Sequence, residues 1–235
     1  VQPTSKFKYL GSILSTPIPD GDILDAEISR RISSAAHAFR RLIWSSTALS
    51  RTNKIVLYQS LVLPVLLTAC QTWTMNKSHI HRLEVVHNRY LRRLKGVPAM
   101  SPLTTEEMHA LHPPTVPVSN TIEKLKASFI GSLVRQAPPY PPSTALYSHG
   151  RPDFGRPAGG LITSYRDNAR ELFTSARFIT IAKAKFDEAK ARQIRCPAQP
   201  VAPALAAILQ IRACPSWEKL AASTTLWRDI CCAIG

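Results

Sequence analysis

Basic side chains recur at helical spacing within the first hundred residues, and they are the groups with the most specific chemistry. They are Arg30, Arg31, Arg40, Arg41, Arg82, Arg89, Arg92, Arg93 and Lys95. Guanidinium and ammonium groups on a rigid helix bind the phosphate backbone of nucleic acids with little base readout. The chain has a net charge of +15, which favours the same partner. The alternative is that about half of these side chains only solvate the outer helix faces.

The sequence contains only poor candidates for a catalytic or metal-binding site. The carboxylates of Asp20, Asp22, Asp25 and Glu27 could be proposed as metal ligands, but they stand where a helix begins. Capping and the helix dipole explain negative charge at that position. No Asp-Asp pair, phosphate-binding loop or Gly-x-Ser-x-Gly motif occurs. We therefore expect no catalytic residue, metal or cofactor in this chain.

The histidines and cysteines predict neither a zinc site nor a disulfide framework. The pairs His79/His81 and His109/His112 have no neighbouring cysteine or carboxylate cluster, so surface or satisfied histidines are expected. The five cysteines are scattered and form no C-x-x-C pair. This usage is typical of a reducing, intracellular compartment, nuclear or cytoplasmic. No segment is apolar and long enough to predict a membrane span.

Three consecutive helices are expected to position the basic residues, in a unit covering residues 20–98. Apolar residues recur every three or four positions, which is helical period. The second helix, residues 53–69, is apolar nearly all round and should be buried, with Pro64 kinking or dividing it. Trp73, at its end, is expected in the core rather than stacked on nucleic acid. The predicted inner residues are Leu24, Ile28, Ile32, Ala35, Phe39 and Leu42 in the first helix, Leu61 and Leu66 in the second, and Ile80, Leu83, His87, Tyr90 and Leu94 in the third.

The remaining sequence predicts a mainly α chain with a short β element at its start. Residues 1–19 favour a strand, and residues 99–136 favour connecting helices. Residues 137–160 are rich in Pro and Gly and predict a linker. Residues 161–235 predict a looser helical region, helical from 161 to 193 and ending in a helix that packs Trp217, Leu220, Leu226 and Trp227 inward.

Several motifs resemble reverse transcriptases of non-LTR retrotransposons, the long interspersed elements. In order they are Phe7-Lys8-Tyr9-Leu10-Gly11 with Ile23–Ile32, Tyr58-Gln-Ser-Leu-Val-Leu-Pro64, Cys70-Gln-Thr-Trp73, and Leu83-Glu-Val-Val-His87-Asn-Arg-Tyr-Leu-Arg-Arg-Leu94. These segments of the chain resemble the junction of palm and thumb in that family and the helices that follow it.

Downstream, the resemblance continues in three shorter segments. They are Lys126–Arg135, Gly150–Pro157 with Tyr165–Asp167, and Trp217–Arg228. Phe129 stands at a tryptophan position of the family pattern, Ser132 at a histidine position, and Ser223 and Thr224 at an acidic-basic pair.

The resemblance implies a fragment that starts after the catalytic turn, since the Asp-Asp turn of the family precedes the Tyr-Leu-Gly segment and would lie before Val1. The parent protein would be an RNA-directed DNA polymerase that uses Mg²⁺. This chain would bind a primer–template duplex without catalysis, with Lys8 and Tyr9 at the primer-grip position. Its other partners would be the missing upstream palm and fingers.

Two other interpretations stay open from the sequence. One is a stand-alone helical nucleic-acid-binding adaptor derived from such an element. The other is a non-functional translation of a decayed copy.

Overall fold

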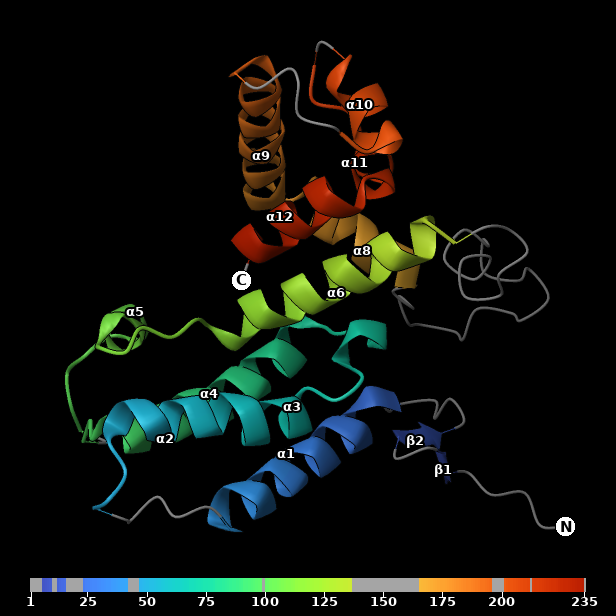
Figure 1. The fold of residues 1–235 in the computed structure, drawn as a ribbon. Coiled ribbons are helices and arrows are strands. Elements are labelled where there is room, and N and C mark those ends of the chain that lie inside the picture. The colour runs from blue at the N-terminus through green and yellow to red at the C-terminus, as the bar shows by residue number, and fades with distance from the viewer. Residues whose placement is uncertain are drawn as a thin grey trace, which may run out of the picture. The chain divides into compact units, whose positions relative to one another are not determined.

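The computed structural model describes residues 6–9, 12–15, 23–41, 47–98, 100–136, 165–195, 201–211 and 213–234 (Figure 1). Only the backbone is described for residues 6–9, 12–15, 23, 41 and 165–168. The chain divides into two compact units, Val1–Ser119 and Asn120–Gly235. The predicted linker, residues 137–160, lies outside the described residues. Helices dominate both units, so the prediction of a mainly α chain is confirmed.

A two-stranded antiparallel ribbon precedes the helices of the first unit. Strand β1 (Lys6–Tyr9) pairs with β2 (Ser12–Ser15), with Lys6 opposite Ser15 and Tyr9 opposite Ser12. The other residues of the predicted 1–19 element lie outside the described part of the chain.

Two 19-residue helices, α1 (Ile23–Arg41) and α4 (Lys77–Lys95), run in the same direction. Near their beginnings, His79 Nε2 of α4 lies 3.2 Å from Asp25 Oδ1 of α1. Nearer their ends, the rings of Phe39 and Tyr90 stack with centroids 4.2 Å apart. Contacts that follow the same order along both helices require a parallel pair, and this pair positions the basic residues.

The second predicted helix is divided into three parts, as its proline predicts. An α-helix, α2 (Arg51–Leu57), leads into a π turn, η1 (Tyr58–Val62), and a short helix, α3 (Leu63–Leu66). Pro64 has no backbone N–H and cannot continue the α-helical ladder. The preceding N–H, of Leu63, bonds to the carbonyl of Tyr58, five residues back. The division is a direct consequence of Pro64.

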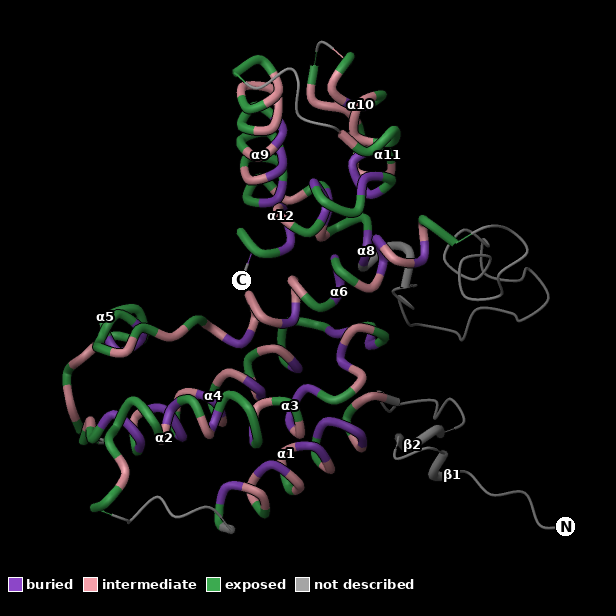
Figure 2. Tube along the Cα trace, in the orientation of Figure 1, coloured by how far each residue is buried: buried purple, intermediate pink, exposed green. Residues whose placement is uncertain are grey.

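Burial of this divided helix is one-sided, so the prediction that it is the buried helix holds for one face only. Ile55, Tyr58, Val62 and Leu66 are buried, whereas Leu61 is 48% exposed. The buried residues recur every three or four positions and form one row. Leu61 lies one residue off that row and faces solvent, although its type predicted the core. Buried and exposed positions also alternate along α1 and α4 (Figure 2).

Helix α4 has a buried row that agrees with its predicted inner face. Leu83, His87, Tyr90 and Leu94 are buried, and Ile80 is half-buried. The helix begins at the N-cap Asn76 and ends at Gly96, whose φ of 70° places it in the left-handed region that glycine adopts without strain.

The inner residues of α1 follow the predicted row as far as they are described. Ile28, Ala35 and Phe39 are buried, and Leu24 and Ile32 are half-buried. Leu42, Asp20 and Asp22 lie outside the described residues. Trp73 follows a 3₁₀ turn, η2 (Cys70–Thr72), and is 6% exposed, which confirms its place in the core.

After α4 the chain forms α5 (Thr105–Ala110) and then α6 (Val118–Val134), which begins at the boundary between the units. The second unit continues with α8 (Tyr165–Thr174), α9 (Ala176–Arg195), α10 (Pro203–Leu209), α11 (Trp217–Ala222) and α12 (Thr224–Ile234). The expected helix over 161–193 is therefore two helices. Ser175 separates them, and its Oγ accepts a hydrogen bond from Phe178 N at 3.2 Å.

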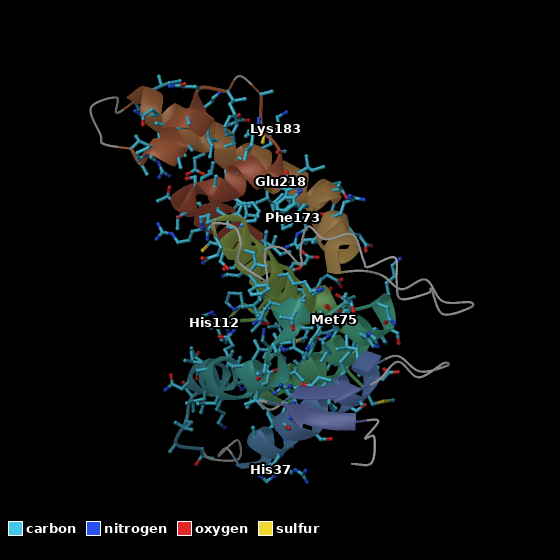
Figure 3. The ribbon with its side chains drawn as sticks, turned by 90° about the vertical axis from the view of Figure 1, so that its right-hand side faces the viewer. His37, Met75, His112, Phe173, Lys183 and Glu218 are labelled. Atoms are coloured by element: carbon cyan, nitrogen blue, oxygen red, sulfur yellow. The ribbon has the colours of Figure 1, made fainter. Side chains whose placement is uncertain are left out.

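The second unit has a hydrophobic core of its own rather than a loose set of helices. Phe173 lies at its centre, with its ring stacked on Trp217 at 4.4 Å (Figure 3). Trp227 donates from Nε1 to the carbonyl of Ala127 at 2.9 Å. A Cβ on Gly131 would lie 1.9 Å from that nitrogen, so the indole needs a glycine there. Leu220, Leu226 and Trp227 are buried as predicted, and Trp217 is half-buried.

Within the described residues, none of the helices is long and apolar enough to cross a membrane.

Candidate nucleic-acid interface

Arg89 and Arg93 lie one turn apart on the outer face of α4, and both are exposed. The guanidinium carbon of Arg89 lies 5.9 Å from the ring centroid of Tyr90. That of Arg93 lies 5.7 Å from the ring centroid of Phe39 on α1. Both distances are within the range of cation–π attraction, which adds about 0.5–1 kcal/mol at exposed sites. The aromatic rings of the α1–α4 contact thus support the two outermost arginines of α4.

Two more arginines belong to the same end of the unit. Arg40 follows Phe39 on α1, is exposed, and donates from Nε to the carbonyl of Ala36 at 3.4 Å. Arg51 begins α2 and is exposed, and its guanidinium packs against Gly96 at the end of α4. The four arginines at this end of the unit are thus Arg40, Arg51, Arg89 and Arg93. Within the described part of the chain, none of the salt bridges involves these four residues.

Sequence reasoning did not single out Arg51. Ser50 accepts a hydrogen bond from Asn53 N at 3.2 Å and caps α2. Ser at an N-cap is a sequence signal that would have placed Arg51 in the first helical turn. Its contact with Gly96 joins residues 45 positions apart, and no local pattern encodes that contact.

Arg30 and Arg31 are engaged with Glu27, on their own helix. Arg31 Nε donates to Glu27 Oε1 at 2.7 Å, and Arg30 donates to both carboxylate oxygens at 2.8 and 3.1 Å. Glu27 is 2% exposed and Arg31 is 7% exposed. A carboxylate this deeply buried requires charged partners. In this structure the Arg31 guanidinium therefore has a buried carboxylate as its partner.

Arg82 bridges the two parallel helices near their beginnings. One of its nitrogens pairs with Asp25 Oδ1, and the other donates to Ser29 Oγ at 2.8 Å. The same Asp25 oxygen contacts His79, which is 2% exposed. His79 is thus a satisfied histidine, and Asp25 has a cationic partner in Arg82. Arg82 is half-exposed, but this arrangement makes it a link between α1 and α4.

Arg92 and Lys95 hold the chain that follows α4. Arg92 donates to the carbonyl of Leu103 at 2.9 Å. Lys95 is 5% exposed and donates to the carbonyls of Met108 and Leu111, each at 2.8 Å. Burial lowers the pKa of Lys95 from its usual range. In this structure Lys95 is therefore an internal ammonium that holds backbone carbonyls.

The remaining candidate residues are placed only by their backbone. Lys8 and Tyr9 lie at the end of β1, and Arg41 is the last residue of α1. Their side chains lie outside the described part of the structure. Of the eleven candidate residues, the structure brings Arg40, Arg89 and Arg93 to one exposed end, and it places Arg31 and Lys95 inside.

Clusters of acidic, cysteine and histidine side chains are the usual sign of a metal site. In the described part of the chain, no group of three or more of them could hold a metal ion.

One curated protein with partial similarity is the RNA-directed DNA polymerase from the mobile element jockey of Drosophila funebris. It is 31% identical over 103 residues, which is 40% of this chain and 10% of the polymerase. The chain thus spans about a tenth of that relative's length. No family model matches the chain, and no solved structure matches it. The similarity supports an origin related to retrotransposon reverse transcriptases.

Proposed function

We propose that this chain binds the sugar–phosphate backbone of a nucleic-acid duplex, as the thumb and downstream region of a non-LTR retrotransposon reverse transcriptase. The proposal rests on the exposure of Arg89 and Arg93 and on whether they form ion pairs. Both are exposed, and in the described residues neither is paired with a carboxylate. Their charge is therefore available to an anionic partner.

The aromatic support gives these arginines a defined direction. A guanidinium held near a ring still has N–H groups that can donate two bonds to a phosphate. Holding the side chain in place also lowers the conformational entropy that binding would otherwise cost. The proposed contacts are to phosphate, so binding would tolerate changes of base sequence.

The parent reaction proposed here is RNA-templated DNA synthesis with Mg²⁺ held by palm aspartates that this sequence does not contain. Lys8 and Tyr9 are proposed as part of a primer grip. A primer–template duplex and the palm and fingers of the polymerase are the proposed partners. The proposed location is nuclear or cytoplasmic.

The test is the salt dependence of binding to a primer–template duplex. Each neutralised phosphate releases counterions, so log affinity falls with log salt by roughly 0.9 per contact. Replacing Arg40, Arg89 and Arg93 together by Gln should lower that slope by roughly one unit for each phosphate contact that is lost. Arg92 is left unchanged because its bond to Leu103 supports the fold.

The matched control replaces Lys183, Lys219 and Arg228 by Gln. These residues are exposed in the second unit, and this variant also loses three positive charges. It should leave the slope nearly unchanged. Equal weakening by both variants would mean that the charge acts only as a diffuse field. No weakening by either would contradict nucleic-acid binding by these residues.

A further inference from the structure

A second ridge of α4 is polar, and it holds the segment from Leu103 to Ser119. Glu84, Asn88, Arg92 and Lys95 recur along this ridge every three or four residues. Near the start of the ridge, Glu84 Oε1 accepts from Ser119 Oγ at 2.7 Å. Toward its end, Arg92 and Lys95 donate to backbone carbonyls of the segment. The segment 103–119, named the strap below, is thus fastened along the length of α4.

Lys95 fastens the turn that ends α5. Its Nζ donates to the carbonyls of Met108, His109 and Leu111 at 2.8, 3.2 and 2.8 Å. It also lies 3.2 Å from Thr115 Oγ1. Carbonyls at a helix end lack partners within the helix, so a cation there satisfies them. This ammonium is a fixed positive charge under the strap.

His109 connects the strap to both Lys95 and Asn88. Its Nε2 lies 3.1 Å from Asn88 Oδ1, and its Nδ1 lies 2.9 Å from Thr115 Oγ1. An amide oxygen only accepts, so Nε2 carries the hydrogen and Nδ1 has the lone pair. The Thr115 hydroxyl accepts from Lys95 and donates to His109. These are the bonds of a neutral imidazole, which has one donor and one acceptor nitrogen.

A neutral His87 has the same arrangement on the other side. Its Nε2 lies 3.3 Å from the carbonyl of Val116 and must donate to it. Its Nδ1 lies 2.7 Å from Tyr58 Oη, so it accepts the tyrosine hydrogen. The rings of His87 and His109 are stacked with centroids 5.8 Å apart. A second proton on either ring would reverse the bond to its hydroxyl partner and add a buried positive charge beside the other ring and Lys95.

We propose that the strap is a proton-sensitive latch, in which protonation of the stacked His87–His109 pair releases residues 103–119 from α4. The proposal does not depend on nucleic-acid binding.

The groups facing this pair come from three elements. Tyr58 lies on η1, and Glu84 and Lys95 lie on α4 with His87; Glu106 lies on α5 with His109. Glu84 and Glu106 favour the charged form of His109, whereas Lys95 disfavours it. Burial outweighs the carboxylates and lowers the pKa of His109. Burial, and then His109, lower the pKa of His87 to about 4.

The direction of the pH effect follows from these shifts. A released imidazole titrates near its ordinary pKa of about 6.5, whereas the docked rings titrate lower. Between these values the released state binds more protons, so docking weakens as the pH falls. Above about pH 6.5 both states are neutral, and docking has its full strength.

Hydrogen exchange read by mass spectrometry on the full chain tests the latch. After correction for intrinsic exchange rates, peptides from 104–117 should lose at least about tenfold in protection between pH 7.5 and 5.0. Peptides from 23–41 should keep theirs, because the α1–α4 packing does not use this pair.

Two variants sharpen the experiment. His109→Gln removes one titrating ring and should flatten the pH profile of the strap peptides. His81→Gln removes an exposed histidine from α4 and should leave the wild-type profile. If His109→Gln does not fold, the wild-type peptide profiles still decide. Protection of 104–117 that does not change with pH, loss that spreads equally through the whole unit, or flattening by His81→Gln would each overturn the proposal.

Discussion

Two buried tyrosines of the first unit differ in what their hydroxyls contact. Tyr58 Oη bonds to His87 Nδ1 at 2.7 Å. Burial raises the pKa of Tyr58 well above its usual range, so its hydroxyl stays a donor. Tyr90 is 5% exposed, and its hydroxyl has no hydrogen-bond partner in the described part of the chain. The two residues are therefore expected to respond differently to loss of the hydroxyl.

Tyr58→Phe should lower the free energy of unfolding by about 1–3 kcal/mol, because it leaves the buried Nδ1 of His87 without its donor. Tyr90→Phe should change it by less than about 1 kcal/mol, or raise it, since the hydroxyl there contributes no bond. Urea denaturation of both variants measures the difference. A loss at Tyr90→Phe equal to that at Tyr58→Phe would show that Tyr90 Oη has a partner.

Sequence reasoning identified the residue types of the interface better than their surroundings. Arginines off the apolar stripe were expected on the surface, and Arg89 and Arg93 are there. Arg31 and Lys95 were expected there too, but each lies inside. Arg31 meets the buried Glu27, four residues earlier, and Lys95 meets carbonyls 13 to 16 residues later. The helical spacing of apolar residues cannot distinguish a solvated charged side chain from one that satisfies buried polar groups.

At the scale of the elements, the packing of α4 gives a matched pair of substitutions. Leu83 is fully buried, whereas Val85, two residues later on the same helix, is 52% exposed. Leu83→Ala should lower the free energy of unfolding by about 2–5 kcal/mol, through lost burial and the cavity left behind. Val85→Ala should change it by no more than about 0.5 kcal/mol. Thermal or urea unfolding compares the two, and equal losses would contradict the assigned helix face.

The helices could be predicted because period and proline chemistry act within one segment. The buried rows of α1 and α4 follow the apolar period, and Pro64 divides the second helix as expected. The burial of Leu61 could not be predicted from its type. In a segment that is apolar on every side, no contrast marks the face that meets the neighbouring helices. Which helices pack in parallel depends on contacts such as Phe39 with Tyr90, far apart in sequence.

At the scale of the whole molecule, the sequence lacks the adjacent aspartates that a polymerase of this kind uses to hold two metal ions. Primer extension by this chain alone, with a homopolymer template and Mg²⁺ or Mn²⁺, should give no product above buffer. A chain that binds duplex but does not extend it would agree with the proposed function. Robust extension by the purified protein would place a catalytic centre among residues assigned here to structure.

The contact between Trp227 and the Ala127–Gly131 segment of α6 also forms late during synthesis of the chain. The indole fits against α6 only after about a hundred further residues have been added to the chain. At about 5–20 residues per second, the ribosome needs roughly 5–20 s to synthesise that length. During that interval Ala127, Ile130 and Leu133 await the partners that bury them in the finished unit. In the first unit, Arg82 pairs with Asp25, 57 positions earlier, so the corresponding delay is about half as long. Chaperones would therefore bind this protein after α6 has been synthesised and before α12 is complete.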